Sequence, residues 1–312
     1  MPLRPLGLGE LLDGAVAMVR RYPRPTLGLS AGIALVTTLL NVPFLIAYLD
    51  SPLLDPAATA PGSDVDVAGE IGALSGTLGA YGLLSLLAGV VLAGVITAVV
   101  GKGVLGQPMS LGQAWSAVRP QLLRLVGLAV VVLLAVWGLF VGSIAVAVGL
   151  AAAAGPATLL LGIPLVIAGT CLAIHVYVRW ALAPSVMVLE RARVLPSMRR
   201  SAVLVKGDWW RVFGILLLVV LITTFVSAIL QMPFEAQSLF AEFNGEPVEV
   251  EPLDIVLSSV GQALSMTVVS PFAAAVSALL YVDRRMRAEG LDVSLAAAAA
   301  AAGGAPADRP AP

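Results

Sequence analysis

Six long runs of apolar residues divide the chain, and charged residues gather between them. None of the runs contains a Lys, Arg, Asp or Glu; they cover residues 26–49, 76–100, 125–150, 157–178, 212–232 and 256–282. Each run is close to the ~20 residues that a helix needs to cross a bilayer. A barrel strand would alternate apolar and polar residues, and a lone strand would leave backbone groups unpaired in lipid. The pattern therefore predicts an all-α integral membrane protein with six transmembrane helices.

Composition narrows the possible classes of function. The 312 residues are 59% apolar and 12% charged, whereas soluble domains contain roughly 25% charged residues. A net charge of -1 provides no basic surface for a nucleic acid, so we expect no nucleic-acid partner. The only cysteine, Cys171, lies inside an apolar run, which excludes an internal disulfide framework and a cysteine-based zinc site.

The distribution of Lys and Arg predicts the orientation. All 18 lie before the first run, between the second and third, between the fourth and fifth, or after the sixth. The segments 50–70 and 233–254 are acidic instead. By the positive-inside rule, both termini are cytoplasmic. Because Arg greatly outnumbers Lys, as is typical of GC-rich bacterial genomes, we expect a multi-pass protein of the bacterial inner (plasma) membrane.

The predicted organisation has three parts. Residues 1–25 form a cytoplasmic amphipathic helix, residues 26–282 the six-helix membrane domain, and residues 283–312 a cytoplasmic low-complexity tail. Glu10 and Asp13 interrupt the first segment, which also lacks a compact apolar region before a small-residue cleavage site. We therefore expect this segment to be retained and not removed as a signal peptide.

Residues 195–209 predict an amphipathic helix beside the fifth run. Leu195, Met198, Ala202, Val205 and Trp209 recur every three or four positions and share one face. Basic residues occupy the remaining positions, and two tryptophans mark the start of the apolar run. Such a helix is expected to lie flat in the cytoplasmic headgroup layer, with the tryptophans in the aromatic belt.

The same arrangement is predicted at two further places. Residues 8–22 carry an apolar face, and "MSLGQAWSAVRPQLLRLVGL" (109–128) leads into the third run. A shift of 87 residues aligns Arg124 with Arg211 and Gly127 with Gly214, which suggests a threefold repeat of interfacial helix plus transmembrane hairpin. Each Lys or Arg near an anionic leaflet contributes ~1 kcal/mol. The residues predicted to contact lipid headgroups or a partner are Arg20, Arg21, Arg124, Arg199, Arg200, Lys206, Trp209, Trp210 and Arg211.

Several polar residues fall within or at the ends of the runs. His175 and Arg179 share a helical face at the end of the fourth run, where they either anchor to headgroups or hold a buried polar role. Asn41, Gln231 and Gln262 either hydrogen-bond between helices or line a solute pathway. The sequence leaves both readings open.

Catalytic and metal-binding patterns are not found in the sequence. It contains one histidine, no phosphate-binding glycine loop, and acidic residues without the spacing of a calcium loop. We therefore predict no catalytic residue, no cofactor and no metal site.

Two stretches resemble a known family. "RPLGLGELLDGAVAMVRRYPRPTLGLSAGI" and "MRRSAVLVKGDWWRVFGILLL" are similar to actinobacterial multi-pass proteins grouped with the membrane domain of glycerophosphoryl diester phosphodiesterases, over residues 2–282. The resemblance implies a helical membrane domain, which in that family can be joined to a separate catalytic domain. The longest non-membrane segment here is about 30 residues, too short for the metal-dependent barrel of such an enzyme.

These features predict a non-catalytic inner-membrane protein. Its basic helices would contact anionic lipid, or a membrane or cytoplasmic protein partner, and organise or anchor an envelope- or lipid-related assembly. The alternative is a transporter or channel for an apolar or amphipathic solute, which predicts a cavity lined by Asn41, His175, Gln231 or Gln262. A lipid enzyme within the membrane is the third reading, and the shortage of acid–base groups weighs against it.

Overall fold

The structure is a computed structural model that describes residues 7–49, 51–52, 67–104, 112–113, 116, 119–155, 158–236, 244 and 252–289. These residues contain helices and no strand, which confirms the predicted all-α class for the described part of the chain. The principal helices are α1 (Leu8–Arg21), α2 (Pro23–Leu49), α3 (Val67–Val104), η2 (Arg119–Gln121), α5 (Leu122–Ala154), α6 (Leu159–Trp180), α7 (Ala183–Glu190), α8 (Val194–Lys206), α9 (Trp209–Gln231) and α11 (Pro252–Glu289).

Six of these helices are long and apolar enough to cross a membrane: α2, α3, α5, α6, α9 and α11. Each overlaps one of the six apolar runs, so the predicted number of spanning helices is confirmed by length and composition. Helix α11 is the most enclosed, with 44% of its most apolar window buried, against 17% for the corresponding window of α5. It is therefore the central helix around which the others pack.

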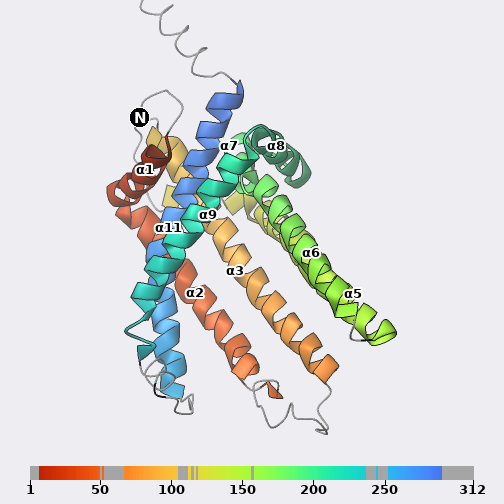
Figure 1. The fold of residues 1–312 in the computed structure, drawn as a ribbon. Coiled ribbons are helices and arrows are strands. Elements are labelled where there is room, and N and C mark those ends of the chain that lie inside the picture. Colours follow the sequence, from red (N-terminus) through yellow and green to blue (C-terminus); the bar gives the residue numbers. More distant parts are fainter. Residues whose placement is uncertain are drawn as a thin grey trace, which may run out of the picture.

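The helices form two groups (Figure 1). Helix α11 contacts α2, α3 and α9, while α5 and α6 pair as an antiparallel hairpin that joins the first group mainly through α3. Helices α1, α7 and α8 gather at one end together with the last turns of α11. We call this the basic end, because Arg and Lys side chains of α1, α8 and α11 lie there; the opposite end is where α2 ends and α3 begins.

The α5–α6 hairpin depends on close backbone approach. A Cβ atom at Gly169 would lie 2.5 Å from the Cβ of Ser143, and one at Gly162 would lie 3.0 Å from the Cβ of Ala147. In lipid, helices associate through such small residues because there is no hydrophobic force between them. Glycine at these two positions therefore sets the spacing of the hairpin.

A proline in the middle of α11 creates one of its contacts with α2. Pro271 has no N–H and leaves the carbonyl of Thr267, four residues earlier, without its helical partner. The buried Ser30 hydroxyl donates a hydrogen bond of 2.8 Å to that carbonyl. The carbonyl oxygen that the proline leaves without a helical partner thus accepts a hydrogen bond from a side chain of the neighbouring helix.

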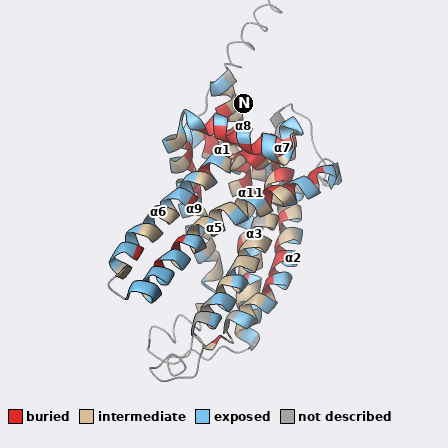
Figure 2. Ribbon diagram, turned by 90° about the vertical axis from the view of Figure 1, so that its right-hand side faces the viewer, coloured by how far each residue is buried: buried red, intermediate tan, exposed pale blue. Residues whose placement is uncertain are grey.

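The main core lies at the basic end. Figure 2 shows that buried residues concentrate around α1, α7, α8 and the adjoining part of α11, whereas the helices below are largely exposed in the isolated molecule. Leu11 and Ala15 of α1, Leu204 of α8, Val212 of α9 and Tyr281 of α11 belong to one cluster and are almost completely buried. The short helices therefore cap one end of the bundle with a core like that of a soluble protein.

The apolar face of α8 packs against protein. Met198, Ala202 and Val205 are buried where α8 meets α6, α7 and neighbouring helices. Leu195, which was predicted to belong to this face, is 64% exposed, because it lies at the edge of the face beside Val203, which is 65% exposed. The periodicity of the face thus reflects protein packing, and any lipid contact would fall to the outward side. Helix α1 repeats the pattern, with Leu11, Ala15 and Met18 against α11.

Some predicted features lie outside the described residues. Part of the predicted middle interfacial segment, including Ser110, is among them, as are most of the two acidic segments and the end of the tail from residue 290. The helix α11 continues past residue 282 to Glu289, so the first residues assigned to the tail belong to the fold.

Buried ion pairs fasten α11 to α8 and α9. Arg284, 4% exposed, pairs with Asp208 and donates two hydrogen bonds of 3.0 and 2.8 Å to the carbonyl of Leu204. Asp283 is fully buried, with Arg211 at 3.3 Å and Arg287 at 3.1 Å. A buried charge is tolerated only with such partners, so these pairs fix where α11 ends relative to the turn at Gly207.

Candidate functional site: a polar cavity between four helices

Asn41, Gln231 and Gln262 meet in one cavity although they come from three different helices. Helices α2, α3, α9 and α11 enclose it, and its volume is about 260 Å³. We call it the polar cavity, because most of its lining side chains bear hydroxyl or amide groups. The lining residues are Thr37, Thr38, Asn41, Tyr81, Ser85, Ser227, Gln231, Gln262, Ser265, Met266, Val269 and Ser270.

Helical spacing explains why these side chains converge. Ser227 and Gln231 are one turn apart on α9, and Gln262 and Ser265 are nearly so on α11. Residues separated by three or four positions project from the same side of a helix. Each helix therefore turns a short polar stripe toward a common point in an otherwise apolar bundle.

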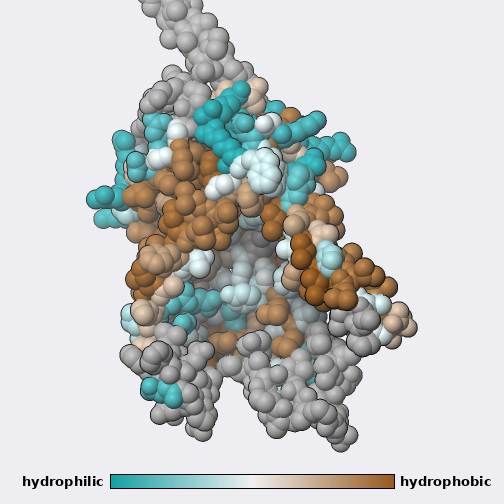
Figure 3. All heavy atoms as spheres, viewed as in Figure 1, coloured by the Kyte–Doolittle hydropathy of each residue, from teal (hydrophilic) through white to brown (hydrophobic). Residues whose placement is uncertain are grey.

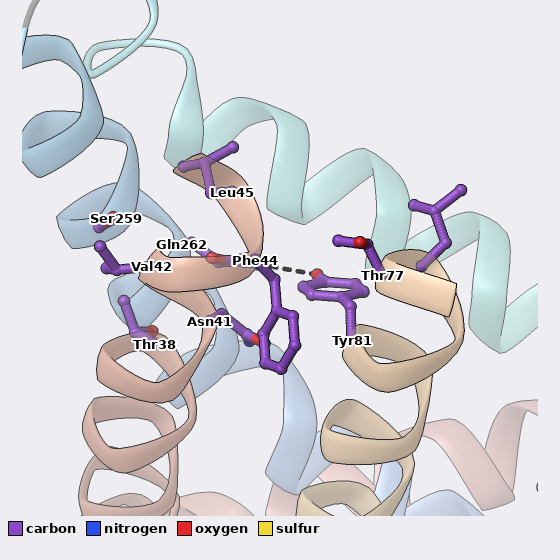
Figure 4. A pocket seen from close by; sticks show the side chains of 10 residues that line it. Thr38, Asn41, Val42, Phe44, Leu45, Thr77, Tyr81, Ser259 and Gln262 are labelled. Atoms are coloured by element: carbon purple, nitrogen blue, oxygen red, sulfur yellow. Dashed lines mark hydrogen bonds between the residues drawn. The ribbon is translucent and has the colours of Figure 1, made fainter. Parts of the chain in front are cut away.

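A second cavity adjoins the first. It has a volume of about 240 Å³ and shares Thr38, Asn41, Tyr81 and Gln262 with the polar cavity. Figure 4 shows the side chains around it, with Phe44 and Tyr81 projecting into the space between α2 and α3. We call it the apolar cavity, because carbon atoms make up most of its surface; the other lining residues are Val42, Phe44, Leu45, Thr77, Leu78 and Ser259.

One hydrogen bond stands where the two cavities meet. The Gln262 amide nitrogen lies 3.1 Å from the Tyr81 hydroxyl and donates to it, joining α11 to α3 (Figure 4). Both residues line both cavities. The bond therefore forms part of the wall between a polar and an apolar space.

Asn41 sits between the cavities with an unsatisfied oxygen. Its side chain is 6% exposed, and its Oδ1 atom is buried without a hydrogen-bond partner. A buried acceptor without a partner costs roughly 1–3 kcal/mol, so each case in a native protein needs an explanation. At a cavity wall, the simplest explanation is a partner that arrives with a ligand or with water.

An apolar groove between α2 and α3 also meets the polar cavity. It measures about 390 Å³ and shares Thr37 with that cavity; Ile33, Val36, Leu84 and Val91 are among its lining residues. The hydroxyl-rich space is therefore bordered by apolar surface on two sides. Together these spaces offer the mixture of apolar surface and a few polar groups found in ligand sites, whose volumes are typically ~300–1,000 Å³.

The molecule is hollowed beside this site. Figure 3 shows the hollow between the α5–α6 hairpin and the other helices, with hydrophilic side chains visible inside it. Helices α6 and α9 touch near the basic end, where the rings of His175 and Trp209 stack with centroids 5.3 Å apart. The hairpin thus touches α9 near the basic end and packs on α3 further along, where Gly79 approaches Trp137 and Gly82 approaches Leu133.

His175 and Arg179 do not join the cavity. Both are exposed near the basic end of α6, and neither is among the residues that line either cavity. His175 is held by the stack with Trp209, whose ring in turn stacks on Phe213 at 5.1 Å. The structure therefore brings together Asn41, Gln231 and Gln262 and leaves the other two predicted polar residues elsewhere.

The predicted headgroup contacts fall into two sets. Arg200 pairs with Glu190 at 3.5 Å, Arg211 pairs with Asp283, and Trp209 is half-buried with its Nε1 atom lacking a partner, so these residues contribute to the fold. Trp210 is 77% exposed. The other exposed members are Arg20 and Arg21 on α1, Arg124 on α5, and Arg199 and Lys206 on α8.

Sequence reasoning did not identify Tyr81, Ser85, Ser227 or Ser265 as site residues. A hydroxyl group is common in spanning helices, where it often bonds back to its own helix, and a single one carries little signal. The available signal was the one-turn spacing from an amide residue, as for Ser227 and Gln231. No group of three His, Cys, Asp or Glu residues in the described part of the chain is arranged to hold a metal ion.

Comparison with known proteins gives one match. The family described as a domain of unknown function, DUF7847, matches residues 65–284, which include α3 to α11 and therefore Tyr81, Gln231 and Gln262. Helices α1 and α2, with Asn41, precede the matched range. The match names neither the glycerophosphoryl diester phosphodiesterase membrane domain nor the actinobacteria. No curated protein and no solved structure matched the chain. Because the match covers more than half of the sequence, the chain belongs to the DUF7847 family.

Proposed function

We propose that this protein is a non-catalytic transporter of an amphipathic solute. The solute enters from the lipid of the bilayer and binds in the polar cavity. The observation that supports this is the convergence of Asn41, Gln231 and Gln262 on one cavity in an apolar bundle. Polar residues are costly inside a membrane, and they commonly mark a substrate pathway. This was the alternative reading of the sequence, and the cavity now favours it.

Helix packing alone explains the cluster less well. Polar residues that serve only to join helices are expected to pair with one another across the interface. Gln262 does so with Tyr81, but the Asn41 Oδ1 atom has no partner. The polar cavity also leaves about 260 Å³ beside these residues, partly open to the surroundings, where a ligand could lie.

The hollow beside the cavity supports exchange with lipid. It lies between the α5–α6 hairpin, which packs on α3, and the other helices, so a solute dissolved in the bilayer could reach the bundle from the side (Figure 3). With both termini in the cytoplasm of a bacterium, as the charge distribution predicts, the cavity would lie in the outer half of the plasma membrane. The resemblance to the membrane domain of glycerophosphoryl diester phosphodiesterases fits a lipid-related solute and is part of the proposal.

A second function is favoured by the basic end. The outward side of α8 combines the exposed apolar residues Leu195 and Val203 with Arg199 and Lys206. Such a surface suits anionic headgroups or an acidic partner protein. Organising a lipid-related assembly, the first prediction from the sequence, is compatible with solute binding because the two surfaces lie at different places in the fold.

The first test is the identity of what the full-length protein retains in mild detergent. Native mass spectrometry of the wild type should show a bound amphiphile that is lost when the cavity is made apolar by Asn41→Leu or Gln262→Leu. Thr170→Val on α6, outside both cavities, is the matched control and should leave it bound. Equal retention by the wild type and both cavity variants would contradict the proposal.

A further inference from the structure

The cavities lack ionisable groups that could balance a charged ligand. Among the described residues that line them there is no Lys, Arg, His, Asp or Glu. Sites for phosphate or carboxylate groups normally provide Arg, Lys or a helix N-terminus. An ionised group placed here would lose its hydration without gaining a counter-charge, which strongly disfavours binding.

The lining also offers uncharged hydrogen-bonding groups, among which several acceptors lack a donor. The Thr37 hydroxyl donates to the carbonyl of Ile33 at 2.7 Å, so its oxygen is left to accept. The Gln262 amide nitrogen donates one of its two hydrogens to Tyr81, so its second hydrogen and the Gln262 carbonyl oxygen remain for a ligand. The Asn41 Oδ1 atom is a buried acceptor without a donor. A ligand that complements the lining therefore brings at least one donor for Asn41 and can also accept hydrogen bonds from the amide and hydroxyl groups.

From these two observations we propose that the ligand is an uncharged amphipathic molecule whose head carries hydroxyl or amide groups. The head occupies the polar cavity and donates to Asn41, and an apolar chain lies in the apolar cavity beyond the Tyr81–Gln262 bond. A phosphate head does not fit, because it is charged and the lining provides no counter-charge. This inference rests on the proposed function and specifies the class of solute.

The polar head and the apolar chain of such a molecule match two adjoining spaces, the polar cavity and the apolar cavity. Val42, Phe44, Leu45 and Leu78 lie on one side of the shared wall, and Ser227, Gln231 and Ser265 lie on the other. A molecule with a hydroxylated head and one or two acyl chains can therefore satisfy both spaces at once. A fully apolar solute would leave the hydroxyl and amide groups of the polar cavity without partners.

Two lipids that differ only in the head provide the test. The full-length protein in nanodiscs is photo-crosslinked to dioleoylglycerol or to dioleoyl phosphatidic acid, each with a diazirine in the acyl chain. We expect at least a tenfold preference for dioleoylglycerol, and a loss of at least tenfold in Asn41→Leu. In Gln231→Arg, which adds a cation to the lining, crosslinking to phosphatidic acid should rise at least tenfold. Ser227→Lys provides a second position for the cation if Gln231→Arg does not fold.

The outcomes separate this inference from the proposed function. Equal or stronger crosslinking of phosphatidic acid in the wild type, abolished by Asn41→Leu, would overturn the uncharged class while leaving the cavity as a binding site. If neither lipid responds to Asn41→Leu, while Thr170→Val and the wild type behave alike, the inference and the proposed function both fall. Crosslinked peptides from α2, α3 or α11 would support the cavity, and peptides from α5 and α6 alone would count against it.

Discussion

At the basic end every buried charge described above has a partner, and the unsatisfied Trp209 Nε1 atom belongs to a ring stacked between two others, whereas the unsatisfied Asn41 Oδ1 atom belongs to a residue that lines open space. Arg284 satisfies Asp208 and the Leu204 carbonyl, and Asp283 is held between two arginines. Both regions bury polar groups among apolar helices. Satisfied groups stabilise one arrangement, and an unsatisfied group next to open space marks a place where another molecule is expected.

Packing also differs between the two regions: the basic end is the more tightly packed. The basic end is filled by short helices whose inward residues, such as Leu11, Ala15 and Val205, are completely buried. The opposite half contains cavities and a hairpin that joins the bundle mainly through α3. A rigid end joined to a looser half is the arrangement expected of a protein whose ligand enters sideways, since regions that bind and move are drawn from the less stable parts of a fold.

The largest effect is expected from Arg284→Met. The substitution removes the two hydrogen bonds that the buried guanidinium donates to the Leu204 carbonyl, each contributing ~1.5–3 kcal/mol, and the ion pair with Asp208, whose side chain is 45% exposed. Thermal unfolding in neutral detergent measures the loss. Lys206→Met, which removes an exposed charge from the same end, should remain within about 0.5 kcal/mol of the wild type. Similar melting of both variants would show that the basic end is not the rigid part.

The next effect is expected from Gly169→Ala in the hairpin. Its new Cβ would lie 2.5 Å from that of Ser143, and overpacking of this kind costs ~1–3 kcal/mol. Gly138→Ala on α5 is the matched control, because nothing lies within 4 Å of its added Cβ. Retention of the co-purifying amphiphile should be the same in both variants, since neither residue lines the cavities. If Gly169→Ala loses the amphiphile, the packing of the hairpin contributes to binding at the site.

A smaller effect, of opposite sign, is expected from Asn41→Leu. Removing an unsatisfied buried acceptor should raise the free energy of unfolding of the ligand-free protein by ~1 kcal/mol. Thr37→Val lies on the same helix and lines the same cavity, but its hydroxyl is already bonded to Ile33, so no gain is expected. Denaturant titration after removal of bound lipid compares the two. A destabilised Asn41→Leu variant would mean that Asn41 is a packing residue.

The smallest effect concerns the outward side of α8. Anionic lipid added to the protein in neutral detergent should raise its melting temperature more than neutral lipid does. Arg199→Gln together with Lys206→Gln should reduce that stabilisation by at most ~1 kcal/mol per charge. An unchanged response would remove lipid recognition by α8 and leave the cavity as the candidate site.

Local patterns predicted most of the secondary structure. The six spanning helices follow from the length of the uncharged runs, and the short helices α1 and α8 follow from the spacing of residues such as Leu11 and Ala15 or Met198 and Ala202. The same spacing did not reveal what the apolar faces touch. Headgroups and a protein core both accept an apolar stripe, so the sequence could not show that α8 packs against α6 and α7.

The candidate site was predicted in part. Asn41, Gln231 and Gln262 stand out because amides are rare in spanning helices, but whether they meet depends on how α2, α9 and α11 rotate and cross. His175 carried the same signal and lies elsewhere, against Trp209. Tyr81 gained its importance only from its position opposite Gln262.

The sequence by itself determined that this is a helical protein with six segments suited to a bilayer, because hydrocarbon imposes a length and a polarity that can be counted along the chain. Only the tertiary structure decided which polar groups share a cavity and which charges are buried in pairs. Those outcomes depend on contacts between residues far apart in the sequence, such as Tyr81 with Gln262 and Asp208 with Arg284, and no local pattern encodes the rotation of one helix against another.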